Sequence, residues 1–130
     1  MKPELTYLAL VTALTGLMWI PYVLNRIAVW GVPDTVGYPQ TPKPQAAWAL
    51  RMKAAHANAV ENLVVFAALV LVASIAGISN GATMFAAALY FWSRLVHVIA
   101  YTFAVPWVRT LAFAGGFVAQ ATFALQILVR

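Results

Sequence analysis

Three polar side chains, Arg94, His97 and Tyr101, follow one another at helical spacing in an otherwise apolar stretch of the sequence. With about 100° between successive residues of a helix, they fall within about 60° of arc and form one polar stripe. In apolar surroundings, ionisable groups are costly unless they are paired. The stripe is therefore a candidate functional site.

The preceding segment carries a second polar group, consisting of Arg51, Asn58 and Glu61. These residues fall within about 80° of one another on a helix, whereas His56 points well away from Asn58. A helix with two polar directions suits a site that is shared between neighbouring chains.

The depths of these residues predict which of them meet. At about 1.5 Å per residue, Glu61 lies roughly 24 Å from the expected helix end at Gly77, and Arg94 lies roughly 18 Å from the start of the next, antiparallel helix at Ala82. His97 lies at roughly 22 Å, so the carboxylate is within reach of either base. We expect a Glu61–Arg94 ion pair, which by itself would serve only to fix the helix register.

A third feature is the run from Pro106 to Thr110, which is expected to open a helix. Arg109 and Thr110 then lie where free backbone N–H groups and the helix dipole favour an anion such as a carboxylate, phosphate or thiolate. The alternative is an interfacial arginine that extends to lipid phosphates. No metal site is expected, because His56 and His97 lack a third ligand.

The composition fixes the setting of these residues. Of 130 residues, 64% are hydrophobic and 8% are charged, and the mean hydropathy of +0.85 is that of a membrane protein. The net charge of +5 comes from basic residues scattered singly along apolar segments, so it indicates membrane orientation and not nucleic-acid binding. The absence of cysteine excludes disulfides and a cysteine nucleophile.

Four membrane-spanning helices with short connections use the whole chain, because each needs roughly 20 apolar residues. The sequence therefore predicts an all-α integral membrane four-helix bundle as a single domain over residues 1–130. Pro21 is expected to kink the first helix, and the glycines and prolines from Gly31 to Pro44 are expected to form a loop. The predicted helices are 5–30, 44–78, 82–103 and 106–129.

Four crossings put both termini on one side of the membrane and the long loop on the other. Five basic residues share the loop side with only Lys2 and Arg130 opposite, and positive residues favour the cytoplasm. We therefore predict both termini outside, in the inner membrane if the source is bacterial. The five loop-side residues are Arg26, Lys43, Arg51, Lys53 and Arg109.

The run Arg51-Met-Lys-Ala-Ala-His56-Ala-Asn58-Ala-Val-Glu61-Asn62, followed by Leu63-Val-Val-Phe66, resembles the signature of the MAPEG family. These are membrane-associated proteins in eicosanoid and glutathione metabolism. The resemblance extends over the whole chain, including its length, four helices and long first loop. It implies a homotrimer that holds glutathione, without a metal, between adjacent protomers near the cytoplasmic face.

The resemblance also implies roles for individual residues. Arg109 would stabilise the glutathione thiolate, with Thr110 following it, and Arg94 would pair with Glu61. Two positions depart from the synthases of the family, which usually have arginine at the position of Ala57 and tyrosine at that of Phe113. The residues expected to contact or brace the tripeptide are Arg51, Asn58, Glu61, His97 and Tyr101, with Arg26 as a further contact.

The sequence thus favours a glutathione-dependent membrane transferase or peroxidase that acts on lipophilic electrophiles entering from the bilayer. Its expected partners are copies of itself, membrane lipid and a lipophilic small molecule. An alternative is a non-catalytic lipid-binding or assembly subunit, because the family contains such members. An ion or proton pathway through Glu61, Arg94 and His97 is disfavoured, since the first and last helices supply no ionisable partner at the midplane.

Overall fold

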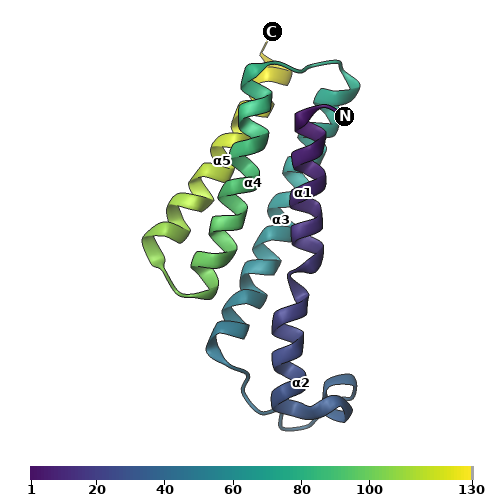
Figure 1. The fold of residues 1–130 in the computed structure, drawn as a ribbon, viewed down its shortest axis with the longest axis vertical. Helices are drawn as coiled ribbons and strands as arrows, with labels where there is room; N and C mark the ends of the chain where they lie inside the picture. The colour runs from purple at the N-terminus through teal and green to yellow at the C-terminus, as the bar shows by residue number, and fades with distance from the viewer. Residues whose placement is uncertain (130) are drawn as a thin grey trace.

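The described residues form helices joined by short connections, and no strand occurs in them (Figure 1). A computed structural model describes residues 1–129, and Arg130 lies outside the described residues. The all-α prediction is confirmed. The helices are α1 (Pro3–Leu17), α2 (Trp19–Val36), α3 (Ala47–Ile75), α4 (Gly81–Thr102) and α5 (Pro106–Leu128).

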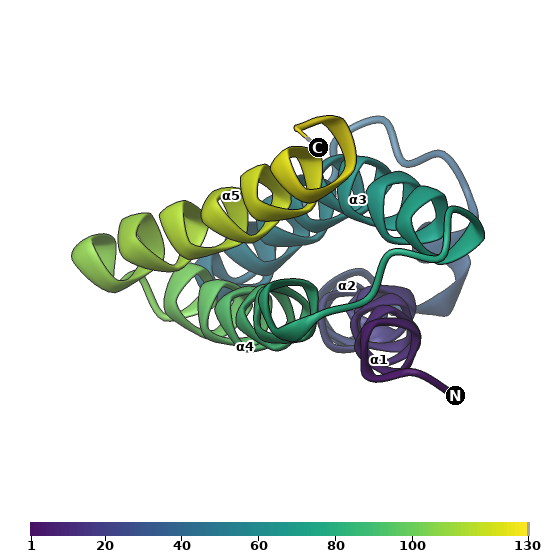
Figure 2. The same ribbon diagram turned by 90° about the horizontal axis from the view of Figure 1, so that it is seen from above.

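Four elements within residues 1–129 are long and apolar enough to cross a membrane, with α1 and α2 together counting as one of 34 residues. Both termini lie at one end of the bundle, which we call the termini end (Figure 1). The loop after α2 and the α4–α5 turn lie towards the other end, which we call the loop end. Seen along the bundle, α3 and α5 form one side, and α1, α2 and α4 form the other (Figure 2).

The first membrane element is broken at Met18, between α1 and α2. The cause is Pro21, whose nitrogen has no proton to donate to the carbonyl of Leu17 and whose ring crowds that carbonyl. The helix accordingly ends at Leu17, and Met18 donates instead to Thr15 at 3.4 Å. The predicted helix 5–30 is therefore two helices that meet at a bend.

The loop predicted from Gly31 to Pro44 is too long, because α2 continues to Val36. Gly31 has a positive φ of 78°, which interrupts the helix, and a new helical turn begins immediately after it. Pro33 is compatible with that turn because the first residues of a helix need no N–H donor. The threonine hydroxyl of Thr35 donates to the Gly31 carbonyl at 2.8 Å and closes the turn.

The second membrane helix is shorter than the predicted 44–78, since α3 covers Ala47–Ile75. Its end is a Schellman motif, in which Gly77 N–H donates to Ser74 and Ile78 N–H donates to Ala73. Gly77 supplies the positive φ of 72° that this motif requires. Asn80 then caps α4 reciprocally with Thr83, which fixes the start of the next helix.

The α4–α5 hairpin is closely packed through small residues. Gly116 and Ala119 are buried, and a Cβ added at Gly115 would lie 2.5 Å from the Ser93 hydroxyl oxygen. The backbones therefore approach more closely than larger residues would permit. This hairpin gives α5 a fixed position relative to the polar stripe of α4.

The hydrophobic core lies toward the termini end. The rings of Phe66 and Tyr90 stack with centroids 3.8 Å apart, and Phe123 meets Phe66 edge-on. A smaller cluster, in which Met18 packs with Ala55, Ala59 and Val98, continues toward the loop end. Between these clusters and the loop end, polar residues replace apolar ones on α3, α4 and α5.

Candidate functional site

A cavity of about 340 Å³ lies at the loop end, where α3, the end of α4 and the start of α5 meet. We call it the polar cavity. It brings together residues from three parts of the sequence, including five that the sequence analysis singled out. Its lining residues are Asn58, His97, Tyr101, Arg109, Thr110 and Phe113.

Arg109 is the exposed cation of this cavity, and its guanidinium carbon lies 4.9 Å from the centroid of the Tyr101 ring. This cation–π contact holds the guanidinium beside the cavity without neutralising it. The start of α5 has no side-chain cap, so the N–H groups of Trp107 and Val108 lack helical partners. Arginine and helix terminus together favour an anion.

Thr110 lies one residue further along α5, and its hydroxyl donates to the Pro106 carbonyl at 3.1 Å. The hydroxyl oxygen keeps acceptor capacity, and rotation of the side chain would release its proton to a ligand.

Arg51 lies beside the polar cavity in an adjoining cavity of about 170 Å³, which Tyr101 and Arg109 also line. Its Nε donates to the Thr102 carbonyl at 2.9 Å, at the end of α4, where carbonyls have no helical partner. Arg51 therefore holds α3 to α4 and places a second cation near Arg109. Neither cavity is lined by an acidic side chain.

Arg94 is buried, with 3% of its surface exposed, and its Nη2 donates to Asn58 Oδ1 at 2.7 Å. The predicted ion pair with Glu61 is wrong within one chain, since no carboxylate in residues 1–129 lies within ion-pair distance of Arg94. The reason is rotation about α3, because Glu61 is about 60° further round the helix than Asn58. Asn58 faces α4, whereas Glu61 is exposed.

His97 is buried between two aromatic rings at the inner wall of the polar cavity. Its ring meets Tyr101 at a centroid distance of 5.6 Å and Phe113 at 6.3 Å. Its Nδ1 has no hydrogen-bond partner within residues 1–129. A buried imidazole nitrogen without a partner is suited to contact a bound ligand.

Besides Arg94, two nominated residues line neither cavity. Arg26 is on α2, where it contacts Gln45 at 3.4 Å and lies 5.2 Å from the Trp30 ring centroid. Glu61 is on α3 but does not line either cavity. Among the described residues no three His, Cys, Asp or Glu side chains gather in a way that would hold a metal ion.

Two polar contacts escaped the sequence analysis. Glu4 is buried, and its Oε2 accepts hydrogen bonds from Ser79 at 2.6 Å and Thr83 at 2.8 Å, which ties α1 to the start of α4. A lone carboxylate in an apolar segment is the signal that would have found it. The hydroxyl of Tyr22 and His56 Nδ1 share a hydrogen bond of 2.7 Å, which joins α2 to α3.

One of the comparisons with known proteins identifies the family of the chain. The sequence model of the MAPEG family matches residues 7–129, a range that includes every residue of the polar cavity. No curated protein and no solved structure gives a significant match to the chain. Because the family match covers nearly the whole sequence, the chain belongs to the MAPEG family.

Proposed function

We propose that the protein is a glutathione-dependent membrane transferase or peroxidase that acts on lipophilic electrophiles. The observation that carries this proposal is the polar cavity, in which Arg109 and the free N–H groups of α5 meet Asn58, His97 and Tyr101. The family includes glutathione transferases and peroxidases as well as non-catalytic members. The choice between these classes therefore depends on the cavity.

The lining fits an anionic thiol peptide. Glutathione carries two carboxylates, and the two adjoining cavities offer Arg51 and Arg109 with no opposing acid. The volume of about 340 Å³ is within the usual range for small-ligand sites, about 300 to 1,000 Å³. Asn58, Tyr101 and Thr110 supply hydrogen-bonding groups that can orient the peptide.

The proposed chemistry uses Arg109 as an electrostatic stabiliser. Its guanidinium and the N–H groups of Trp107 and Val108 favour the thiolate over the thiol, and the released proton passes to water. The thiolate then attacks the electrophilic carbon of the substrate, and the electron pair of the bond that breaks departs with the leaving group. At a peroxide it attacks one oxygen, the O–O bond breaks, and the alkoxide leaves and takes a proton from water. A second glutathione then converts the glutathione sulfenic acid to the disulfide and water. The reaction needs no metal and no covalent enzyme intermediate.

Binding of glutathione between adjacent protomers of a homotrimer is part of the proposal. It is supported by Glu61, which lies midway along α3 and is exposed on the single chain. A carboxylate that faces hydrocarbon is costly, so a neighbouring chain is expected to cover it. Arg26, which lies outside the polar cavity of its own chain, would contact the peptide held by a neighbour.

We also propose that both termini are outside and that the polar cavity faces the cytoplasm, where low-molecular-weight thiols are kept reduced. The basic loop end supports this orientation. Single-cysteine variants Lys2→Cys and Tyr38→Cys would test it, because the natural chain has no cysteine. A membrane-impermeant maleimide added outside should label position 2 and spare position 38, and the reverse pattern would contradict the orientation.

The decisive experiment measures thiolate formation. Adding millimolar glutathione to the purified protein should produce thiolate ultraviolet absorbance at neutral pH, and Arg109→Ala should remove most of it. Conjugation of a generic hydrophobic electrophile should fall by about 10²-fold or more. Lys53→Ala is the matched control, because Lys53 is an exposed cation on α3 that lines neither cavity.

The same experiment separates the alternatives. If no thiol in a panel yields thiolate or turnover and lipid copurifies with the protein, the lipid-binding scaffold replaces the enzyme. The panel of thiols is informative because Ala57 and Phe113 stand where the synthases of the family usually have arginine and tyrosine. Phe113 lines the polar cavity itself.

A further inference from the structure

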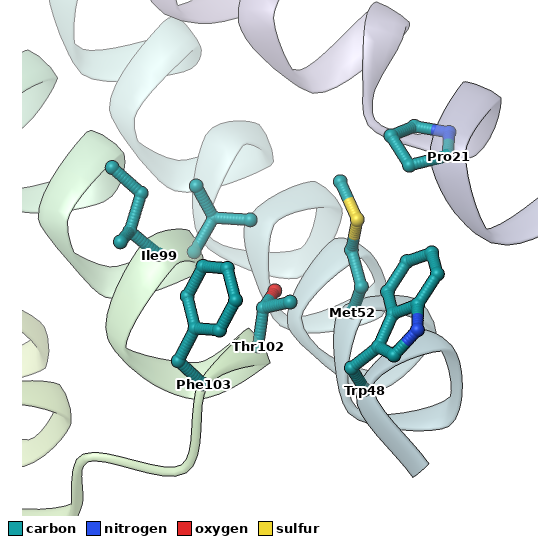
Figure 3. A pocket seen from close by; sticks show the side chains of 7 residues that line it. Pro21, Trp48, Met52, Ile99, Thr102 and Phe103 are labelled. Carbon is teal, nitrogen blue, oxygen red and sulfur yellow. The ribbon is translucent and has the colours of Figure 1, made fainter. Parts of the chain in front are cut away.

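A second cavity, of about 440 Å³, opens on the side of the bundle where α2 and α4 lie apart (Figure 3). We call it the apolar groove. The side chains of α3 form its floor, and those of α2 and α4 form its walls. The residues labelled in Figure 3 are Pro21, Trp48, Met52, Ile99, Thr102 and Phe103.

The groove exists because of the break at Met18. On the termini side of the break α1 packs against both α3 and α4, whereas on the loop side α2 packs chiefly against α3. The loop-end half of α4 is thus left without a neighbour on this side. Ile99 and Phe103, which are 52% and 69% exposed, form the uncovered wall.

One hydroxyl lines the apolar groove, and it lacks a partner. Thr102 is 7% exposed, and its hydroxyl makes no hydrogen bond to any residue in the range 1–129. Figure 3 shows this oxygen between the Phe103 ring and Met52. A buried hydroxyl in an otherwise apolar lining needs a hydrogen-bond acceptor, so the groove suits a hydrocarbon chain that ends in a polar group.

We propose that the apolar groove binds one acyl chain of an ester-linked membrane lipid, with the ester carbonyl accepting a hydrogen bond from Thr102. The depth of Thr102 supports this assignment. The 22 residues of α4 span about 33 Å, close to the hydrocarbon thickness of about 30 Å. The last residue of α4 therefore lies at the hydrocarbon boundary, where lipid ester groups are found.

Lipid is a better occupant than a second copy of the chain. Glu61, which needs a protein neighbour, is nine residues from Met52 and so lies on the opposite side of α3, about 180° away. The groove itself carries no charge, and apolar side chains gain little by exchanging lipid for protein. The Arg51–Thr102 contact separates the groove from the polar cavity, so this lipid is distinct from the proposed thiol and does not depend on it.

Photocrosslinking would test the location of the lipid. The probe is a diester phosphatidylcholine with a diazirine on one acyl chain, placed in nanodiscs with the whole protein. We expect crosslinks to Met52, and Ile99→Trp, which fills the groove, should reduce them at least fivefold. Leu111→Trp is the control, because Leu111 is an exposed apolar residue on α5 outside the groove.

The hydrogen bond to Thr102 is tested separately, by competition between diester and dialkyl ether phosphatidylcholine. The wild type should retain the ester lipid about threefold to tenfold better, and Thr102→Val, which keeps the shape, should retain both lipids equally. Equal labelling of wild type and Ile99→Trp, crosslinks from Met52 to a second chain, or no ester preference in the wild type would each overturn the proposal.

Discussion

Arg94 is a guanidinium buried among membrane helices and held by a neutral amide. Its contact with Asn58 Oδ1 at 2.7 Å has the length of a charge-assisted hydrogen bond. Asn62 donates to the same oxygen at 3.3 Å, and its backbone carbonyl accepts a hydrogen bond from Gln120. Asn58 is thus the centre of a network that joins α3, α4 and α5 and supports the inner wall of the polar cavity.

This network makes Asn58 more important for stability than a surface amide. We expect Asn58→Ala to lower the free energy of unfolding by about 3 kcal/mol, because it leaves a buried cation without its acceptor. Asn58→Asp should preserve stability, since a carboxylate keeps the acceptor and adds an opposite charge. Circular dichroism during titration with a denaturing detergent would measure both.

Asn62→Ala is the control for this pair, because it removes one donor and leaves Asn58 against Arg94. It should cost no more than about 1 kcal/mol. Equal losses for Asn58→Ala and Asn58→Asp would mean that the guanidinium depends on another group.

The sequence predicted which residues line the polar cavity better than it predicted which side chains pair with one another. Helical periodicity put Arg94, His97 and Tyr101 on one face, and the opening of the last helix put Arg109 near them. Depth does not explain why Glu61 and Arg94 fail to pair within one chain, because α3 ends at Ile75 and Glu61 is then roughly 21 Å deep, close to the roughly 18 Å of Arg94. The deciding factor is the rotation of the side chains about α3, which turns Asn58 toward α4. A count of depth along the helix does not describe this rotation.

At the scale of elements, the two turns that end α3 and α4 have the same hydrogen bonds but different residues. Both are Schellman motifs, with Gly77 at φ 72° in one and Ala104 at φ 60° in the other. An alanine in this left-handed region is strained, whereas glycine is not. Ala104 also lines the small cavity with Arg51 and Arg109, so the strained turn positions the start of α5.

We therefore expect Ala104→Gly to raise the free energy of unfolding by about 1 kcal/mol. The reciprocal change, Gly77→Ala, should lower it by about the same amount, because an added Cβ at Gly77 would meet no atom within 4 Å and only the backbone strain remains. The same detergent titration measures both. A loss of stability in Ala104→Gly would show that the methyl group contributes packing that outweighs the strain.

Element boundaries were predictable where one residue decides them. Pro21 predicted the break that ends α1 at Leu17, and Pro106 predicted the start of α5. The run of glycines and prolines after Trp30 misled the prediction, because Pro33 is compatible with the first turn of a helix that restarts after Gly31. Composition alone cannot distinguish a loop from a helix that is interrupted and resumed.

At the scale of the whole molecule, the two opposite sides of α3 that one chain leaves uncovered require different neighbours. The side of Met52 is apolar and compatible with lipid, whereas the side of Glu61 carries an exposed charge at the middle of a membrane helix. The charged side is therefore expected to lie inside an assembly, and the apolar side on its outside.

This asymmetry yields a prediction about assembly. We expect the protein in mild detergent to be a trimer by native mass spectrometry. Glu61→Gln should raise the dissociation constant of the trimer by about 10²-fold, because a buried charge of the neighbouring chain would lose its partner. Lys53→Gln is the matched control, because it removes an exposed charge near the loop end of the same helix. A wild-type monomer, or a Glu61→Gln trimer as stable as the natural one, would mean that water or lipid headgroups satisfy the carboxylate and that no neighbour is needed to cover it.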